Sequence, residues 1–301
     1  MAERVLLVLN PCAGQRRANR YLPEIIRSIL DKGYRCETYV TAKRGDCTEF
    51  LSLHANEFDR VICAGGDGTL NETIAGVLSA HASIPIGYIP CGTTNDYAST
   101  IGLSSDIEQA ARDAAEGVLC PFDVGQFMNR YFTYTASCGA FTKASYSTSQ
   151  TMKNLLGHLA YILEGIKDIP SIRSIHMNVK TETREIEDDF IFFAVTNSTS
   201  VGGILKLDAE RVALNDGLFE VMLVRNPTTA IQLSSILHGI TTMDLPNEMI
   251  HFFTARKISV KSNEEIEWTL DGERADGGCE VEMQNLHNAI NIILPQTVHE
   301  E

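Results

Sequence analysis

A glycine-rich segment with an embedded carboxylate, GGDGTLNE at Gly65–Glu72, has residue types and spacing suited to phosphate chemistry. Successive glycines permit positive φ angles and let a phosphate approach the backbone closely. A strand-like apolar run precedes the segment and a helical pattern follows it, so unpaired N–H groups and the positive end of a helix dipole lie beside the loop. Because the Asp67 carboxylate repels a phosphate, we interpret it as holding a metal ion that binds one. A plain tight turn that needs glycines is the structural alternative.

Two more loops follow strand-like runs in the same manner. NPCAG (Asn10–Gly14) follows the apolar run Val5–Leu9, and CGTTNDYA (Cys91–Ala98) follows the run Ile84–Ile89. The carboxyl ends of neighbouring parallel strands line one crevice, which is where α/β sheets bind their ligands. Three loops at equivalent strand ends therefore predict a site for nucleotide phosphates.

Several other catalytic motifs are excluded. Asn71 stands where the dinucleotide fingerprint G-x-G-x-x-G requires its third glycine. The chain has no G-x-x-x-x-G-K-S/T, no H-E-x-x-H and no G-x-S-x-G. The P-loop, zinc-protease and α/β-hydrolase classes are thereby removed.

Two acidic turns in the C-terminal half carry further candidates. Asp216-Gly217 offers a carboxylate for a metal ion, and Asp271-Gly272-Glu273 offers two acids for general-base work. Asp-Gly is also a strong hairpin signal, so a plain turn is the alternative at both places.

The elements that must position these residues divide the chain into two parts. Over the first 120 or so residues, apolar runs alternate with amphipathic helical patterns such as that of residues 22–30, which predicts parallel strands with right-handed crossovers. Ser105 and Glu108 predict a capping box for a helix that reaches about Glu116. After Pro121, strands predominate and only two helices are convincing, one at about residues 152–166 and one after Pro227. The strand candidates are Tyr131–Cys138, Ile172–Thr181, Ile186–Asn197, Leu218–Arg225, Lys257–Ser262, Ile266–Leu270 and Glu280–Gln284.

We therefore expect an α/β N-terminal nucleotide-binding domain at residues 1–125 and an all-β, antiparallel, sandwich-like C-terminal domain at residues 126–301. A last strand or tail that packs in the first domain is compatible with this division. Pro121, Asp123 and Gly125 predict a hinge within residues 121–130.

Composition narrows the class of protein. The chain has 301 residues, with 25 Lys+Arg against 39 Asp+Glu and a net charge of −14, which argues against a protein that coats nucleic acid. No run approaches the roughly 20 apolar residues of a membrane span. The N-terminus has no signal-peptide pattern and the eight cysteines contain no C-x-x-C pair, so we expect a cytoplasmic protein with reduced thiols.

Taken together, these motifs resemble those of the diacylglycerol kinase catalytic family, which includes bacterial lipid kinases and sphingosine kinases. GGDGTLNE is followed by GTTNDYA after about twenty residues, NPCAG resembles the family's opening loop, and Thr41 with Gly45-Asp46 resembles its Thr…Gly-Asp segment. Phe122–Gly125, the strand entry NDGLFEV at 215–221 and WTLDGE at 268–273 resemble later family motifs in the same order. The similarity covers nearly the whole chain.

The resemblance implies an ATP- and Mg²⁺-dependent lipid kinase with its site in a cleft between two domains. It implies that Asp271 and Glu273 are the candidate general bases. It implies one metal site formed by Asp216 and the carbonyls of Ala213 and Leu218, and a Mg²⁺–water network near the phosphates formed by Asp67, Asp96 and Asp123. The implied ATP-binding residues are Asn10, Gly14, Thr41, Gly65, Gly66, Asp67, Gly68, Thr69, Leu70, Asn71, Glu72, Thr93 and Asn95.

The acceptor is expected to be a diacylglycerol-like lipid, reached by transient contact of a cytoplasmic protein with the membrane. Monoacylglycerol, phosphatidylglycerol and sphingoid bases also fit as acceptors, and the resemblance suggests a homodimer. Two other functions stay open: an NAD kinase, which shares a GGDGT loop, and a catalytically silent sensor of nucleotide or lipid.

Overall fold

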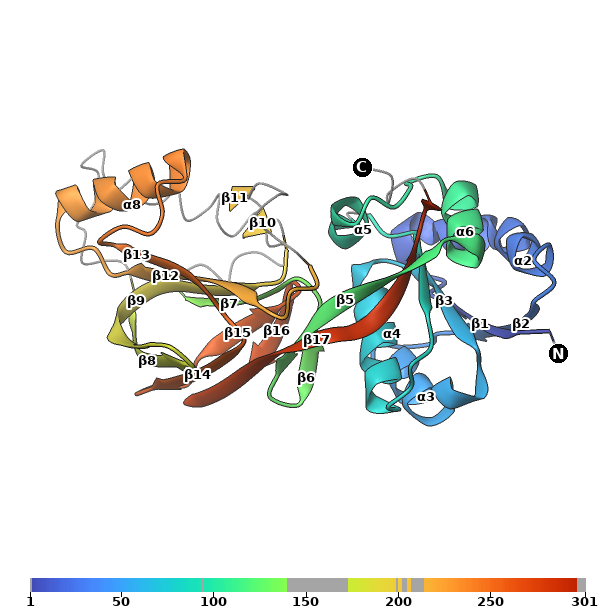
Figure 1. Cartoon of the computed structure of the whole chain (residues 1–301), viewed down its shortest axis with the longest axis horizontal. Helices are drawn as coiled ribbons and strands as arrows, with labels where there is room; N and C mark the ends of the chain where they lie inside the picture. Colours follow the sequence, from blue (N-terminus) through green and yellow to red (C-terminus); the bar gives the residue numbers. More distant parts are fainter. Residues whose placement is uncertain are drawn as a thin grey trace. The chain divides into compact units, whose positions relative to one another are not determined.

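The computed structural model describes residues 2–93, 95–139, 173–198, 200–201, 205–206 and 214–296 (Figure 1). The chain divides into two compact units, unit 1 from Met1–Phe122 with Asn288–Glu301 and unit 2 from Asp123–His287. The chain passes into unit 2 within strand β5 (Val118–Phe127) and returns within β17 (Glu280–Leu294). The boundary thus lies a few residues before the expected position, and the C-terminal tail belongs to unit 1.

The division between Phe122 and Asp123 lies within residues 121–130, where the hinge is predicted, and residues 121–127 form part of β5. Pro121 is exposed on this strand, where a missing N–H group is tolerated. Gly125 is present for packing: a Cβ atom at this position would lie 2.2 Å from the ring of Phe132.

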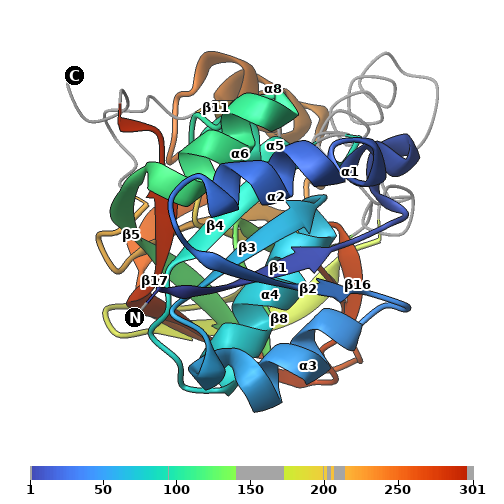
Figure 2. The same cartoon turned by 90° about the vertical axis from the view of Figure 1, so that its right-hand side faces the viewer.

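Unit 1 is an α/β domain built on a parallel sheet. The strand order is β4-β3-β1-β2, with parallel registers throughout. Ile292 and Ile293 of β17 add to β4 in parallel. Figure 2 shows α2 and α6 on one side of these strands and α3 and α4 on the other. The elements are β1 (Arg4–Leu9), η1 (Ala13–Arg16), α1 (Arg17–Arg20), α2 (Leu22–Leu30), β2 (Arg35–Val40), α3 (Asp46–His54), η2 (Ala55–Glu57), β3 (Arg60–Gly65), α4 (Asp67–Ser79), β4 (Ile86–Pro90), α5 (Asp96–Thr100) and α6 (Ile107–Glu116).

The sequence pattern explains most of these elements. In α2 the apolar residues Ile25 and Ile29 lie one turn apart and are fully buried against the sheet. Helix α6 ends at Glu116 as expected, but its predicted capping box is wrong. The N-cap is Asp106, whose carboxylate accepts a hydrogen bond from the Gln109 N–H at 2.8 Å.

Unit 2 is built from antiparallel strands, as predicted. The strand order is β16-β15-β7-β9-β8-β14-β17, and β12 pairs with β9 and β13. Helix α8 (Ala230–Thr242), expected after Pro227, lies over β12 and β13 in Figure 1. The elements are β6 (Arg130–Phe132), β7 (Thr135–Gly139), β8 (Ile175–Thr181), β9 (Glu185–Thr196), β10 (Ser200–Val201), β11 (Leu205–Lys206), β12 (Phe219–Arg225), β13 (Ile250–Ala255), β14 (Lys257–Ser262), β15 (Glu267–Leu270) and β16 (Glu273–Asp276).

Alternation along β12 places two apolar cores on opposite faces of the sheet. Phe219, Val221 and Leu223 belong to one core, and Met222 and Val224 to a second core that includes residues of α8. The segment expected as one strand at 131–138 is two strands, β6 and β7, and the helix expected at 152–166 lies outside the described residues. Among the described residues, no helix has the length and apolar character needed to cross a membrane.

Candidate active site

In unit 1, the three phosphate-type loops lie at the carboxyl ends of β1, β3 and β4 and are joined to one another. The Asn10 side-chain amide donates to Thr69 Oγ1 at 2.9 Å, and the Asn10 N–H donates to the Ala64 carbonyl at 3.0 Å. The Cys91 N–H donates to the Gly65 carbonyl at 2.7 Å. The expected convergence of the loops is therefore present in unit 1.

Glycine is required where these loops pack backbone against backbone. Gly14 has φ +46°, and a Cβ atom there would lie 1.8 Å from the Cys91 carbonyl oxygen. A Cβ atom on Gly66 would lie 3.3 Å from the Gly92 Cα. Any side chain at Gly14 would separate the first loop from the third.

Asp67 occupies the first turn of α4, where its carboxylate is held from two sides. Its Oδ2 accepts the Asp96 N–H at 3.0 Å and its Oδ1 accepts the Tyr88 hydroxyl at 3.3 Å. Burial raises the pKa of the Asp67 carboxyl, and the nearby negative charge of Asp96 raises it further, against these hydrogen bonds. None of the ion pairs found among the described residues involves Asp67 or Asp96.

A magnesium ion fits this pair of carboxylates. Mg²⁺ is usually held by one or two carboxylates together with waters and substrate phosphates, and a cation between Asp67 and Asp96 would relieve their repulsion. The described residues contain no group of three or more His, Cys, Asp or Glu placed to hold a metal ion alone.

Other predicted nucleotide residues have supporting positions. The Glu72 carboxylate accepts the Gly45 N–H at 2.8 Å, which fixes the segment that begins with Thr41. Leu70 is buried and its N–H donates to the Gly66 carbonyl, and its predicted role in nucleotide binding stays a prediction. Thr93 is exposed, Gly65 is the last residue of β3, and Gly68 and Asn71 lie in the first turns of α4.

Asn95 has a backbone suited to the third loop. It lies in the left-handed region at φ +53°, and its side-chain amide donates to the Gly92 carbonyl at 3.0 Å. Its Oδ1 is buried and has no hydrogen-bond partner among the described residues.

In unit 2, Asp271-Gly272 forms the tight turn between β15 and β16. Both residues have positive φ, +47° and +83°, as a two-residue type I′ hairpin requires. The Asp271 carboxylate accepts four hydrogen bonds: from the N–H groups of Thr133, Tyr134 and Thr135 at 2.6, 3.0 and 2.9 Å, and from the Thr133 hydroxyl at 2.9 Å. Burial raises the pKa of this carboxyl, opposed by these donors. Asp271 thus fixes the turn to the chain before β7.

Glu273 occupies a different environment at the start of β16. Its side chain is 41 % exposed, and the Arg130 guanidinium lies 3.9 Å from its carboxylate. Arg130 also donates to the Arg274 carbonyl at 3.1 Å. The two predicted bases thus differ in their contacts, because the Asp271 carboxylate is held by the chain before β7 and that of Glu273 lies beside Arg130.

The remaining predicted metal residues belong to a polar cluster around Asp123. The Asp123 Oδ2 accepts the Gly217 N–H at 2.6 Å, and its Oδ1 lies 3.1 Å from His287 Nδ1. The exposed Asp216 accepts the Leu218 N–H at 2.9 Å, and the Leu218 carbonyl accepts the Asn285 side-chain amide at 3.0 Å. Asp123 thus anchors the Asp216-Gly217 turn, and the metal role predicted for it stays a prediction. Ala213 lies outside the described residues.

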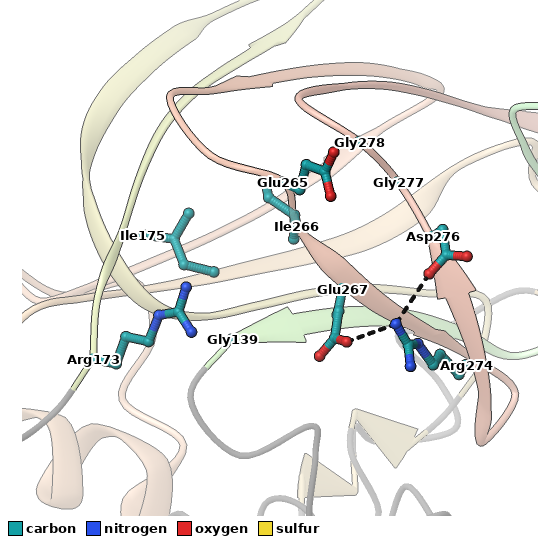
Figure 3. A pocket seen from close by; sticks show the side chains of 10 residues that line it. All are labelled: Gly139, Arg173, Ile175, Glu265, Ile266, Glu267, Arg274, Asp276, Gly277 and Gly278. Atoms are coloured by element: carbon teal, nitrogen blue, oxygen red, sulfur yellow. Dashed lines mark ion pairs between the residues drawn. The ribbon is translucent and has the colours of Figure 1, made fainter.

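A cavity of about 340 Å³ also lies in unit 2, beside β16 (Figure 3). On its wall Arg274 pairs with Glu267 at 2.8 Å and with Asp276 at 3.4 Å. Arg173, which also lines it, pairs with Glu264 at 2.8 Å. The cavity is lined by none of the predicted site residues, and these surface ion pairs account for its charged wall.

Sequence reasoning missed the groups that hold the predicted acids in place. Tyr88 lies within a buried strand run, and Thr133 and Arg130 lie in an unremarkable stretch before β7. No local pattern marks them, because each acts on an acid distant in sequence. The spacing of Asp271 from Thr133 is 138 residues.

Comparisons with known proteins agree with this arrangement. A family described as "Diacylglycerol kinase catalytic domain" matches residues 4–127, and one described as "YegS C-terminal NAD kinase beta sandwich-like domain" matches residues 136–294. A diacylglycerol kinase of Bacillus subtilis (strain 168) is 32 % identical over 301 residues, 99 % of each chain. One of Staphylococcus carnosus (strain TM300) is 28 % identical over 303 residues, 99 % of this chain and 97 % of the relative. A crystal structure of a diacylglycerol kinase from Bacillus anthracis str. Sterne has the same fold, with a TM-score of 0.73, 22 % identity and 98 % of each chain covered.

Proposed function

The chain belongs to the diacylglycerol kinase family of lipid kinases, and from that premise we propose that it transfers the γ-phosphate of ATP, with Mg²⁺, to a hydroxyl group of diacylglycerol. The observation that carries this proposal is the set of three linked loops in unit 1, with Asp67 and Asp96 brought together beside them. The names of the relatives support diacylglycerol as the acceptor.

The residues of unit 1 bind and orient the nucleotide. The first N–H groups of α4 have no acceptor within the helix and lie at Asp67 and Gly68, beside the positive end of its dipole. Asn10 keeps the first loop against Thr69, so the phosphates meet one preformed surface. Mg²⁺, when bound, neutralises phosphate charge, and Asp67 with Asp96 would hold it.

The residues of unit 2 act on the acceptor. Phosphoryl transfer requires in-line placement, charge neutralisation and a group near the attacking oxygen, and little covalent chemistry from the protein. Glu273 accepts the proton of the attacking hydroxyl as transfer proceeds, while Asp271 keeps the hairpin in place. A base of ordinary acidity suffices, because the hydroxyl becomes acidic only as the new bond forms.

The acceptor lies in a lipid surface, so we also propose a cytoplasmic protein that contacts the membrane transiently. The homodimer suggested by the family resemblance is part of the same proposal. The mass of the protein in solution, with and without lipid vesicles, tests both.

The test of the reaction is a mixed-micelle assay with dioleoylglycerol, Mg²⁺ and γ-labelled ATP. We expect labelled phosphatidic acid from the wild-type protein and none without Mg²⁺. In a parallel reaction NAD replaces the lipid, and labelled NADP would favour the NAD kinase alternative. Binding of Mg²⁺–ATP with no turnover on any acceptor would favour the silent sensor.

A further inference from the structure

Strand β4, with the sequence IGYIP, has one side chain that carries a polar atom, that of Tyr88. Tyr88 is fully buried, and it lies directly opposite Cys63 of β3 in the parallel register. Its neighbour Ile89 packs in the core that includes residues of α2 and α6. Because successive side chains of a strand point to opposite faces of the sheet, Tyr88 lies on the other face, where Figure 2 shows α3 and α4.

The hydroxyl of Tyr88 reaches the first turn of α4. It donates to Asp67 Oδ1 at 3.3 Å, and this is its one hydrogen bond to a described residue. Burial raises the pKa of the Tyr88 hydroxyl and the nearby Asp67 carboxylate raises it further, so the group keeps its proton and donates. A phenylalanine would fill nearly the same space without the cost of burying a hydroxyl. The bond to Asp67 therefore explains the tyrosine better than packing does.

The Asp67 carboxylate is held by two elements of unit 1. Tyr88 of β4 donates to one oxygen, and the N–H of Asp96, at the start of α5, donates to the other at 3.0 Å. Two donors on different oxygens restrict rotation of the carboxylate about its Cβ–Cγ bond. A carboxylate has about four acceptor positions, more than the two that these donors take. Tyr88 thus orients Asp67 and leaves acceptor positions for a cation or its bound water.

The size of the effect follows from the geometry of this bond. A carboxylate already held in one orientation loses less freedom when it binds a cation. Removing a group that hydrogen-bonds to a metal ligand typically weakens metal binding about tenfold to 100-fold. The bond from Tyr88 is long for an O–H donor, and the Asp96 donor remains when it is lost. We therefore expect a smaller factor, about fivefold, the value of one ordinary hydrogen bond.

We propose that Tyr88 is a positioning residue for the Mg²⁺ site, and that its hydroxyl holds the Asp67 carboxylate in the orientation that binds the ion together with the nucleotide. This proposal rests on the proposed function, in which Asp67 and Asp96 hold Mg²⁺. Tyr88 is fully buried and acts on the ion through Asp67.

The test measures how strongly Mg²⁺ tightens the binding of a non-hydrolysable ATP analogue. Calorimetry gives the dissociation constant in EDTA and in excess Mg²⁺, and their ratio is the coupling between ion and nucleotide. We expect Tyr88→Phe to lower this coupling ratio about fivefold and to change the dissociation constant in EDTA by less than about twofold. The Mg²⁺ concentration for half-maximal transfer to dioleoylglycerol should rise by a similar factor, and excess Mg²⁺ should restore kcat.

A second substitution, Asp67→Asn, shows whether Tyr88 acts through Asp67. The double variant with Tyr88→Phe should have the coupling ratio of Asp67→Asn alone, because Tyr88 then has no carboxylate to orient. A further loss of similar size in the double variant would show that Tyr88 acts by another route, and would overturn the proposal.

Tyr39→Phe is the matched control. Tyr39 of β2 donates to Asp46, the first residue of α3, at 2.9 Å, just as Tyr88 donates to the first residue of α4. The two substitutions therefore remove the same kind of bond at the start of two helices of unit 1. We expect Tyr39→Phe to leave the coupling ratio at its wild-type value. An equal loss in both variants would mean that general destabilisation lowers the ratio, and would overturn the proposal.

The remaining outcomes separate this proposal from the proposed function. A wild-type coupling ratio in Tyr88→Phe, when Mg²⁺ does tighten binding to the wild-type protein, would overturn the role of Tyr88 alone. If Mg²⁺ did not tighten binding of the ATP analogue to the wild-type protein, the proposed Mg²⁺ site would be wrong, and the role of Tyr88 with it.

Discussion

Exchanging each acid of the Asp271-Gly272-Glu273 turn for its amide separates the residue that holds the hairpin from the residue that accepts the proton. In Asp271→Asn the backbone is undisturbed, since asparagine tolerates the left-handed region at φ +47°. One carboxylate oxygen accepts both donors of Thr133, and the other accepts the N–H groups of Tyr134 and Thr135. An amide keeps one of these oxygens and replaces the other with an NH₂ group.

The stability change follows from the donors that remain. The Thr133 hydroxyl can rotate to accept from the new NH₂ group, which leaves one N–H, that of Thr133, without an acceptor. An unsatisfied buried donor costs about 1–3 kcal/mol, and removing a buried charge offsets part of this. We expect Asp271→Asn to lower the free energy of unfolding by about 2 kcal/mol, with a loss of kcat below about tenfold because Glu273 is retained.

Glu273→Gln should give the opposite result. Its side chain is 41 % exposed and its ion pair with Arg130 spans 3.9 Å, so the free energy of unfolding should change by less than about 0.5 kcal/mol. Loss of the proton acceptor should lower kcat about 10²- to 10⁴-fold. Urea unfolding is followed through Trp268, the single tryptophan, which is buried in the core of unit 2. If Asp271→Asn removed activity at unchanged stability while Glu273→Gln retained it, the assignment of the two acids would be refuted.

Four further predictions concern the loops of unit 1 and the thiols. Gly14→Ala would place a Cβ atom 1.8 Å from the Cys91 carbonyl oxygen. Calorimetry should then detect no ATP binding, and the free energy of unfolding should fall by about 2–3 kcal/mol. Wild-type affinity for ATP would contradict the packing of the loops. Asp67→Asn should raise the Mg²⁺ concentration for half-maximal activity at least tenfold at saturating ATP, and an unchanged Mg²⁺ requirement would remove Asp67 from the metal site. The exposed Cys12 and Cys279 should react with a thiol reagent at pH 8, and Mg²⁺–ATP should protect Cys12 alone. Equal labelling of Cys12 with and without Mg²⁺–ATP would mean that the phosphates bind away from the first loop. Burial raises the pKa of the Cys91 thiol from 9.0 to about 11. Below pH 9 the protonated thiol therefore makes its full contribution to the free energy of unfolding. This contribution, about 2–3 kcal/mol, is lost as the pH rises to about 11. Replacing Cys91 by alanine should remove that part of the pH dependence, measured as urea midpoints from pH 8 to 11.

The sequence was informative where function depends on local chain geometry. GGDGTLNE, NPCAG and the Asp-Gly turns are short segments whose glycines and polar residues act within a few positions of each other, and each lies at the strand end or hairpin that its pattern predicted. Buried runs such as β1 and alternating strands such as β12 were found for the same reason.

The sequence was uninformative where the decisive contact is distant. Pro121 and Gly125 have the composition of a hinge, whereas this segment is a strand because it pairs with β6, where Gly125 lies opposite Phe132. The different roles of Asp271 and Glu273 depend on the donors of residues 133–135, which no spacing around the turn reveals. The N-cap of α6 is Asp106 and not the neighbouring Ser105. The sequence does not distinguish them, because both residue types cap helices well.

The most direct test of the central claim is transfer of label from γ-labelled ATP to a total lipid extract, with purified protein and Mg²⁺, followed by organic extraction and chromatography. The account predicts label in the organic phase as a product that comigrates with phosphatidic acid, dependent on Mg²⁺ and absent with Glu273→Gln. Label confined to the aqueous phase, or none at all from protein that binds ATP, would contradict it.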